Sequence, residues 1–279
     1  MNRGLLLSVA LMFVAMSLIP MGDTAAKLLT TEHGVAPFFV AFSRFGVGAL
    51  MILAFAGFRV EWRLYRDWRV WLRAGFVAGG IACMVTALRT EPMATVFGAF
   101  FVGPIFSYVL SVLLLGERVT RFQTVFLMAG FGGVLLVVQP GTGGVGLWIA
   151  VLAGLFYGSY LTMSRYLSDL APPRQLMLTQ TALGTLLLAP LGAWQVPEFH
   201  ATVTALVIFS GVASASGNLL LVVAYRRADA TVLAPFVYFQ LISATMLGWT
   251  VFGTFPNPLA LTGLAILMAA GIGTVLLKR

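Results

Sequence analysis

Long apolar runs follow one another along almost the whole chain, and short segments rich in charged residues, glycine or proline separate them. Each run holds about 20 residues, which is the length that a helix needs to cross a hydrocarbon core of about 30 Å at a rise of about 1.5 Å per residue. The pattern therefore predicts an all-α membrane protein. Its ten predicted spans are 4–29, 36–58, 70–88, 92–115, 121–139, 146–165, 174–195, 201–225, 230–253 and 258–277.

The composition agrees with this prediction. Charged residues make up 9% and hydrophobic residues 60% of the 279 residues, whereas a soluble domain carries about 25% charged residues. A chain so poor in charge requires lipid as its solvent. The basic residues behind the formal net charge of +8 stand at the ends of apolar runs, so we expect the lipid bilayer and a small-molecule substrate as partners, and no nucleic acid.

The distribution of Lys and Arg predicts the orientation, because cytoplasmic loops carry an excess of these residues. With the N-terminus in the cytoplasm, only Lys27 and Arg89 lie at outer ends of spans, and Arg44 lies within a span. We therefore expect a multi-pass protein of the cell inner membrane with both termini in the cytoplasm. The fourteen basic residues on the cytoplasmic side are Arg3, Arg59, Arg63, Arg66, Arg69, Arg73, Arg118, Arg121, Arg165, Arg174, Arg226, Arg227, Lys278 and Arg279.

An internal repeat divides the ten spans into two sets of five. Residues 129–136 and 270–277, which end the fifth and tenth spans, agree at six of eight positions. The Ala-Thr-Val of residues 94–96 in the fourth span returns at residues 230–232 in the ninth. Because each set has an odd number of spans, the second lies inverted relative to the first, an architecture typical of secondary transporters that work by alternating access.

Three motifs point to one family: Gly116-Glu117-Arg118 after the fourth span, residues 20–27 (Pro-Met-Gly-Asp-Thr-Ala-Ala-Lys), and the shared ends of the fifth and tenth spans. With them the chain resembles the ten-helix, two-repeat EamA branch of the drug/metabolite transporter superfamily, which includes exporters of aromatic amino acids. The resemblance implies a first EamA repeat at 1–140 and a second at 141–279 in one integrated transmembrane unit. It also implies a central cavity lined by spans 1, 3, 4, 6, 8 and 9, with spans 5 and 10 at the periphery.

Three ionisable residues lie within predicted spans, where charge is costly and indicates a functional hypothesis. Asp23 and Lys27 are four residues apart on the first span and share a face. Arg44 lies on the second span at a depth that allows a pair with Asp23. These residues form either a gate or substrate-carboxylate site, or an ion pair that holds two helices together while Lys27 extends to the membrane surface.

Further candidates lie on the spans that the resemblance places around the cavity. Asn218 either bonds across a helix interface rich in small residues or faces the cavity, and aromatic residues either stack on a flat substrate or pack elsewhere. Prolines inside membrane helices free a carbonyl and permit a bend. The cavity candidates are Asn218, Tyr157, Tyr160, Phe97, Phe101, Tyr238 and Gln240, with Gln180 and Ser243 as lesser polar candidates, and the hinge candidates are Pro104 and Pro235.

The function class follows by elimination. The chain carries no H-E-x-x-H, no G-x-S-x-G and no pair of intramembrane aspartates, and its two His, with few acids nearby, disfavour a metal site. We therefore expect a secondary transporter that is not an enzyme and has no cofactor. Our first hypothesis is export of amino acids, including aromatic ones. The alternatives are uptake of a vitamin, S-adenosylmethionine or a nucleoside-like metabolite, and a membrane scaffold without transport.

Overall fold

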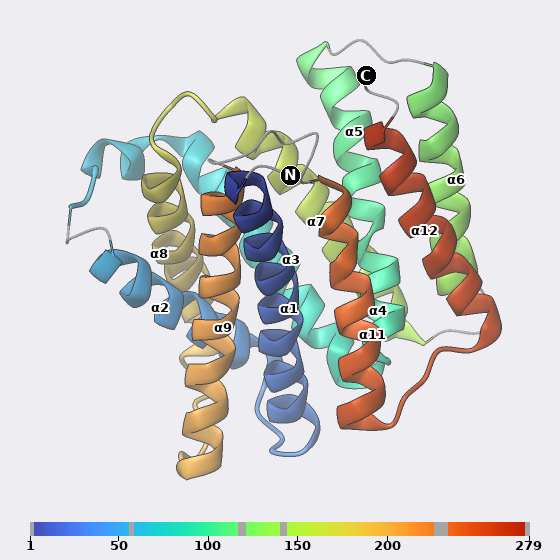
Figure 1. Ribbon diagram of the computed structural model, residues 1–279. Helices are drawn as coiled ribbons and strands as arrows, with labels where there is room; N and C mark the ends of the chain where they lie inside the picture. The colour runs from blue at the N-terminus through green and yellow to red at the C-terminus, as the bar shows by residue number, and fades with distance from the viewer. Residues whose placement is uncertain (1–2, 56–58, 117–120, 140–143, 226–233, 277–279) are drawn as a thin grey trace.

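The chain is a bundle of helices, and the residues that the computed structural model describes contain no strand (Figure 1). These residues are 3–55, 59–116, 121–139, 144–225 and 234–276. The α-helices are α1 (Arg3–Thr31), α2 (Pro37–Phe55), α3 (Trp68–Thr90), α4 (Met93–Phe100), α5 (Val102–Leu115), α6 (Arg121–Val138), α7 (Val145–Tyr166), α8 (Pro173–Gly192), α9 (Ala201–Tyr225), α11 (Phe239–Phe252) and α12 (Pro258–Leu276). Two 3-10 helices, η1 (Trp62–Arg66) and η2 (Ala234–Tyr238), lie between them.

The structure confirms the predicted fold class, ten transmembrane helices in two inverted sets of five. Eight predicted spans form one helix each, the fourth forms α4 and α5, and the ninth forms η2 and α11. Residues 230–233, where the ninth span was expected to begin, lie outside the described residues. The helices long and apolar enough to cross a bilayer are Leu7–Thr31, Pro37–Phe55, Trp68–Thr90, Met93–Leu114, Val145–Tyr166 and Ala201–Ala224, and the shorter apolar ones are Thr124–Val138, Phe236–Phe252 and Pro258–Gly273.

The helix pairs reproduce the inverted symmetry. α1 packs along α9, and α3 packs along α7, so the first and third spans of one repeat meet the third and first spans of the other. α2 packs along α8 and α6 along α12, and these are the second and fifth spans of the two repeats. A two-fold axis exchanges the first two pairs and maps each of the other two onto itself. Figure 1 shows α1 beside α9 in the middle of the bundle and α6 beside α12 at one edge.

The fourth span is interrupted at Phe101, where α4 ends and α5 begins. Pro104 is the third residue of α5 and has no N–H to offer the carbonyl of Phe100. α7 approaches this break closely, since a Cβ atom on Gly154 would stand 2.6 Å from the carbonyl oxygen of Phe100. The break therefore depends on a glycine of the other repeat.

The ninth span changes from η2 to α11 at Tyr238. The rings of Phe101 and Tyr238 meet with their centroids 5.2 Å apart, so the interruptions of the two repeat-related spans lie side by side. Pro235 lies within η2 and Pro104 within the first turn of α5. Their roles as hinges stay predictions.

The two ends of the bundle differ. We name them the near end, where α1 begins and α5, α7 and α9 end, and the far end, where α1, α3 and α11 end; the near end is at the top of Figure 1. Apolar side chains fill the far end in two clusters. Members of the first include Leu88, Met93, Phe97, Val138 and Leu147, and members of the second include Leu29, Val35, Val40, Val85 and Val207.

The crossing of α6 and α12 gives the first prediction. A Cβ atom on Gly133 would stand 2.8 Å from the carbonyl oxygen of Gly263, a backbone atom that has no room to retreat. We expect Gly133→Ala to destabilise the protein by about 1–3 kcal/mol through overpacking. The measurement is the melting temperature of the detergent-solubilised protein. Gly132→Ala is the matched control, because nothing lies within 4 Å of its Cβ position; equal melting temperatures for the two variants would contradict the packing.

Candidate functional site

A cavity of about 600 Å³ is surrounded by helices of both repeats. Its lining includes residues from α2, α6, α8 and α12 in addition to the six spans that the resemblance implied, so the expectation that spans 5 and 10 are peripheral is corrected. The reason is visible at Gly271 of α12. A Cβ atom there would overlap the ring of Tyr238, so the missing side chain lets α12 approach the cavity wall.

The cavity extends from the Asp23–Arg44 pair toward the near end of the bundle. Met16 of α1 lies on its wall and precedes Asp23 in the helix, and Leu161 and Leu221 line it close to the ends of α7 and α9. The far end is filled by the two apolar clusters described above. The structure therefore has a cavity on one side of the pair and a packed seal on the other.

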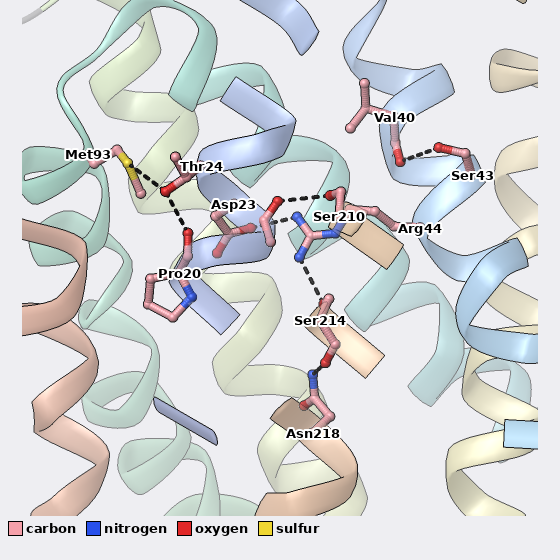
Figure 2. A network of polar contacts seen from close by, with 11 residues as sticks. Pro20, Asp23, Thr24, Val40, Ser43, Arg44, Met93, Ser210, Ser214 and Asn218 are labelled. Carbon is pink, nitrogen blue, oxygen red and sulfur yellow. Dashed lines mark hydrogen bonds and ion pairs between the residues drawn. The ribbon is translucent and has the colours of Figure 1, made fainter. Parts of the chain in front are cut away.

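An ion pair between Asp23 and Arg44 forms the polar floor of the cavity, as Figure 2 shows. Arg44 Nη1 lies 2.5 Å from Asp23 Oδ1, and both side chains are only 4% exposed. Arg44 Nη2 donates to Ser214 Oγ of α9 at 2.9 Å, and Ser210 Oγ donates to the carbonyl of Gly22 at 2.8 Å. The predicted ion pair is therefore present, and Ser214 on α9 of the second repeat accepts a hydrogen bond from the guanidinium nitrogen that does not contact Asp23.

The pair has an energetic consequence. Removing two charges from water costs several kcal/mol per ion, and the attraction between them repays this cost only when the geometry is good. The remaining hydrogen bond to Ser214 satisfies a second guanidinium nitrogen. Loss of either partner would leave the other charge buried alone, which is far more costly than loss of both.

Lys27 does not take the position expected for it. Among the described residues it forms no ion pair with Asp23; it is buried and donates to the carbonyl oxygens of Leu88 and Glu91, the latter at 2.8 Å. These carbonyls belong to the last turn of α3 and its C-cap, where a cation is favourable. Lys27 Nζ also lies 5.3 Å from the ring centre of Phe252. Lys27 thus joins the ends of α1, α3 and α11 at the far end.

Asn218 lines the cavity, one turn from Ser214 on α9. Its Nδ2 donates to the carbonyl of Ser214 at 2.8 Å, within its own helix and not across a helix interface. The small residues before it serve the packing of α9 on α1, since a Cβ atom on Gly217 would stand 3.1 Å from the carbonyl oxygen of Ala15. Gln240 of α11 also lines the cavity.

Aromatic side chains form two groups on the cavity wall. Phe100, Tyr157 and Tyr160 form a row, with ring centroids 4.7 Å apart for the first two and 5.8 Å apart for the last two, and interplanar angles of 35° and 30°. Phe101 and Tyr238 form the second group. All five of these residues line the cavity, and aromatic side chains on a cavity wall suit a flat aromatic ligand.

Phe97 is a correction to the predicted cavity set. It is fully buried and belongs to the larger apolar cluster of the far end. It does not line the cavity. α4, which carries Phe97 and ends before Phe101, packs against α6, α7 and α11.

Arg73 is a polar residue near the cavity. The distribution of Lys and Arg along the sequence indicates it only as part of the cytoplasmic charge excess. It lies in the second turn of α3 and is 4% exposed. Its guanidinium donates to Ser164 Oγ, the Leu176 carbonyl, Tyr160 Oη and Gln180 Oε1 at 2.8–3.1 Å. Its position inside the predicted span 70–88 is the feature that indicates a buried role. Because it lies near the start of that span, the same position also fits a residue at the membrane surface.

The geometry describes a cavity between two inverted repeats, with aromatic walls and few polar groups. The sequence profile of the EamA-like transporter family matches residues 4–139 and 144–277. The chain belongs to this family. It is therefore a multi-pass membrane transporter of small molecules, as the resemblance implied.

Individual relatives agree with the family. A riboflavin transporter from Vibrio cholerae is 28% identical over 257 residues, covering 88% of this chain and 85% of its own. A riboflavin transporter from Rhizobium johnstonii is 28% identical over 216 residues, covering 75% and 70%. An S-adenosylmethionine uptake transporter from Rickettsia bellii is 23% identical over 254 residues, covering 89% and 86%.

A solved structure supports the fold. A protein crystal structure aligns to 98% of this chain and 97% of its own chain with a TM-score of 0.66 and 18% sequence identity. At this identity the similarity concerns the fold alone. It extends over both EamA-matched segments.

The ion pair gives the second prediction. Arg44→Leu leaves the Asp23 carboxylate buried without a counter-charge, so we expect it to destabilise the protein by about 3–5 kcal/mol. The double variant Asp23→Leu/Arg44→Leu should recover most of this loss, because neither charge remains. The measurement is thermal unfolding in detergent.

Arg63→Leu is the control for this comparison, because Arg63 forms an exposed ion pair with Glu61 whose loss should leave the melting temperature nearly unchanged. A double variant as unstable as Arg44→Leu would contradict the account, since the loss would then come from packing and not from an isolated charge.

Proposed function

We propose that this chain transports a flat, aromatic, uncharged metabolite of the riboflavin type across the inner membrane, in the direction of uptake. The observation that carries the proposal is the row of Phe100, Tyr157 and Tyr160 on the wall of a cavity of about 600 Å³. This volume lies within the range of small-molecule sites, about 300–1,000 Å³. Two of the relatives reported above are named riboflavin transporters, which supports the same substrate class.

Amino-acid export, the first hypothesis from the sequence, takes second place. A zwitterion requires partners for a carboxylate and an ammonium group. The charged side chains on the cavity wall, Asp23 and Arg44, already neutralise each other at 2.5 Å. An amino acid would have to break this pair, whereas a neutral ring system needs only aromatic faces and a few hydrogen bonds. None of the relatives named above is an amino-acid exporter, so this hypothesis stays untested.

The orientation of the cavity indicates the state of the transport cycle. With both termini in the cytoplasm, as the Lys and Arg distribution predicts, the near end is cytoplasmic and the cavity faces inward. The repeats 1–140 and 141–279 would then rock against each other to open the far end. Contacts that join the repeats at the seal must part in that movement, and they include Arg44 with Ser214, Ser210 with the Gly22 carbonyl, and Lys27 with Phe252.

The Asp23–Arg44 pair has a different role in this cycle. Both residues belong to the first repeat, so the pair stays intact while Arg44 gains and loses Ser214. The buried charge is thereby neutralised in both states, and Arg44 acts as a gate without exposing an isolated ion to the membrane interior. Pro104 and Pro235, which lie within the two interrupted spans and close to the interruptions, are the proposed hinges.

Flux into proteoliposomes tests the proposal. Labelled riboflavin, S-adenosylmethionine, uridine, phenylalanine and tryptophan are supplied in parallel, and we expect saturable entry of riboflavin above protein-free liposomes. Tyr157→Ala should reduce riboflavin flux by about 2–13-fold, because stacking contacts contribute about 0.5–1.5 kcal/mol beyond buried area. Trp194→Ala is the matched control, since Trp194 is exposed and lies after α8, away from the cavity.

The other outcomes separate the alternatives. Flux of phenylalanine or tryptophan without riboflavin would support the amino-acid hypothesis and contradict the proposal. Absence of flux for every compound would support a scaffold without transport.

A further inference from the structure

The positive charge of Arg73 has no carboxylate partner among the described residues. Among the described residues, Arg44, Arg63 and Arg69 form salt bridges with acidic side chains. Arg73 instead donates to four uncharged acceptors. A buried charge held only by neutral dipoles retains a positive potential around it. Two of its partners, Tyr160 and Gln180, line the cavity. The near-end half of the cavity therefore lies in a positive field.

The contacts of Gln180 determine which way its amide points. Its Oε1 accepts from Arg73 Nη2 at 2.9 Å and from the Tyr160 hydroxyl at 2.7 Å. A guanidinium has only donors, so the amide atom that faces it must be the oxygen. The Nε2 group then points to the other side. Arg73 and Tyr160 thus hold the Gln180 amide in one orientation.

The Nε2 group of Gln180 faces the cavity. In the described part of the chain, every side-chain nitrogen or oxygen without solvent-accessible surface has a hydrogen-bond partner. Among the described residues no acceptor for Nε2 is found, so this atom has accessible surface, and the space that Gln180 borders is the cavity. A fixed amide donor therefore stands at the cavity wall, next to the Tyr160 ring. The Tyr160 hydroxyl is already engaged with Arg73 and Gln180.

We propose that Gln180 Nε2 donates a hydrogen bond to a carbonyl or carboxylate oxygen of the substrate, and that Arg73 is the positioning residue that orients this amide and repels cations. The inference rests on the proposed function, because it requires a flat ligand on the aromatic row. Tyr160 is both the end of the aromatic row and a hydrogen-bond partner of Gln180, so the amide lies beside the surface on which the ligand would rest. The substrate class is then a neutral or anionic flat heterocycle with a carbonyl oxygen, and cationic metabolites are rejected.

Three variants at glutamine positions separate the donor from the charge. Gln180→Met removes the donor and leaves the charge of Arg73. Gln180→Glu removes the donor and also neutralises Arg73, because the carboxylate accepts from it directly. Gln195→Glu makes the same charge change at an exposed position after α8 and serves as the control. Each variant is purified, checked for a single species by gel filtration, and reconstituted for uptake of riboflavin and of S-adenosylmethionine, a sulfonium cation.

We expect both Gln180 variants to raise the KM for riboflavin at least 5-fold, as loss of one hydrogen bond of about 1 kcal/mol requires. Wild type and Gln180→Met should exclude S-adenosylmethionine, whereas Gln180→Glu should raise its uptake relative to riboflavin at least 5-fold. Gln195→Glu should behave as wild type. A merely structural role of Gln180 would not change the ratio of the two substrates in this way.

The contrary results are distinct. Riboflavin uptake by wild type with an unchanged KM in Gln180→Met overturns the inference and leaves the proposed function in place. Uptake of S-adenosylmethionine by wild type as fast as riboflavin also overturns it. Absence of riboflavin uptake by wild type overturns both. If Gln180→Glu does not fold, Gln180→Met alone decides the role of the donor.

Discussion

The buried ion pair between Asp23 and Arg44 is the constraint on which the rest of the structure depends. Two charges at 4% exposure are tolerated in a membrane bundle only while they remain together and hydrogen-bonded. The pair therefore ties α1 to α2, and the bond from Arg44 to Ser214 ties both to α9 of the other repeat. On one side of this point lie the two apolar clusters, and on the other the helices enclose the cavity.

The two charged sites at the cavity, the Asp23–Arg44 pair and Arg73, differ in chemistry, and the difference bears on the substrate. Asp23 and Arg44 cancel each other and offer no net charge. Arg73 has no acidic partner in the described residues, so it leaves a positive field, and it turns the Gln180 amide into a fixed donor. Between these groups the wall is aromatic. On the function proposed above, such a cavity would take a flat ligand rich in hydrogen-bond acceptors in preference to a cation or a zwitterion.

Features that depend on position along one chain were predictable from the sequence. The spans follow from hydropathy, because the bilayer imposes one length on every helix. The Asp23–Arg44 pair was expected because the two residues lie at similar depths in the membrane when residues are counted along each helix. Features that depend on a neighbouring helix were not. The close approach of α7 to the break at Phe101 requires the glycine at position 154, and the helices packed on α4 place Phe97 in the core.

Lys27 and Arg73 show the same limit. Their partners include backbone carbonyls, at Leu88 and Glu91 for Lys27 and at Leu176 for Arg73. A carbonyl is present at every position, so no residue type marks these partners in the sequence.

Thiol accessibility tests most directly the claim that the cavity opens to the cytoplasm while the far end is closed. In a Cys83→Ser background, Leu221→Cys places a thiol on the cavity wall near the end of α9, and Ala201→Cys marks the exposed start of the same helix. A membrane-impermeant maleimide should label position 221 in inside-out vesicles and position 201 in intact spheroplasts. Labelling of position 221 in spheroplasts but not in inside-out vesicles would contradict the account.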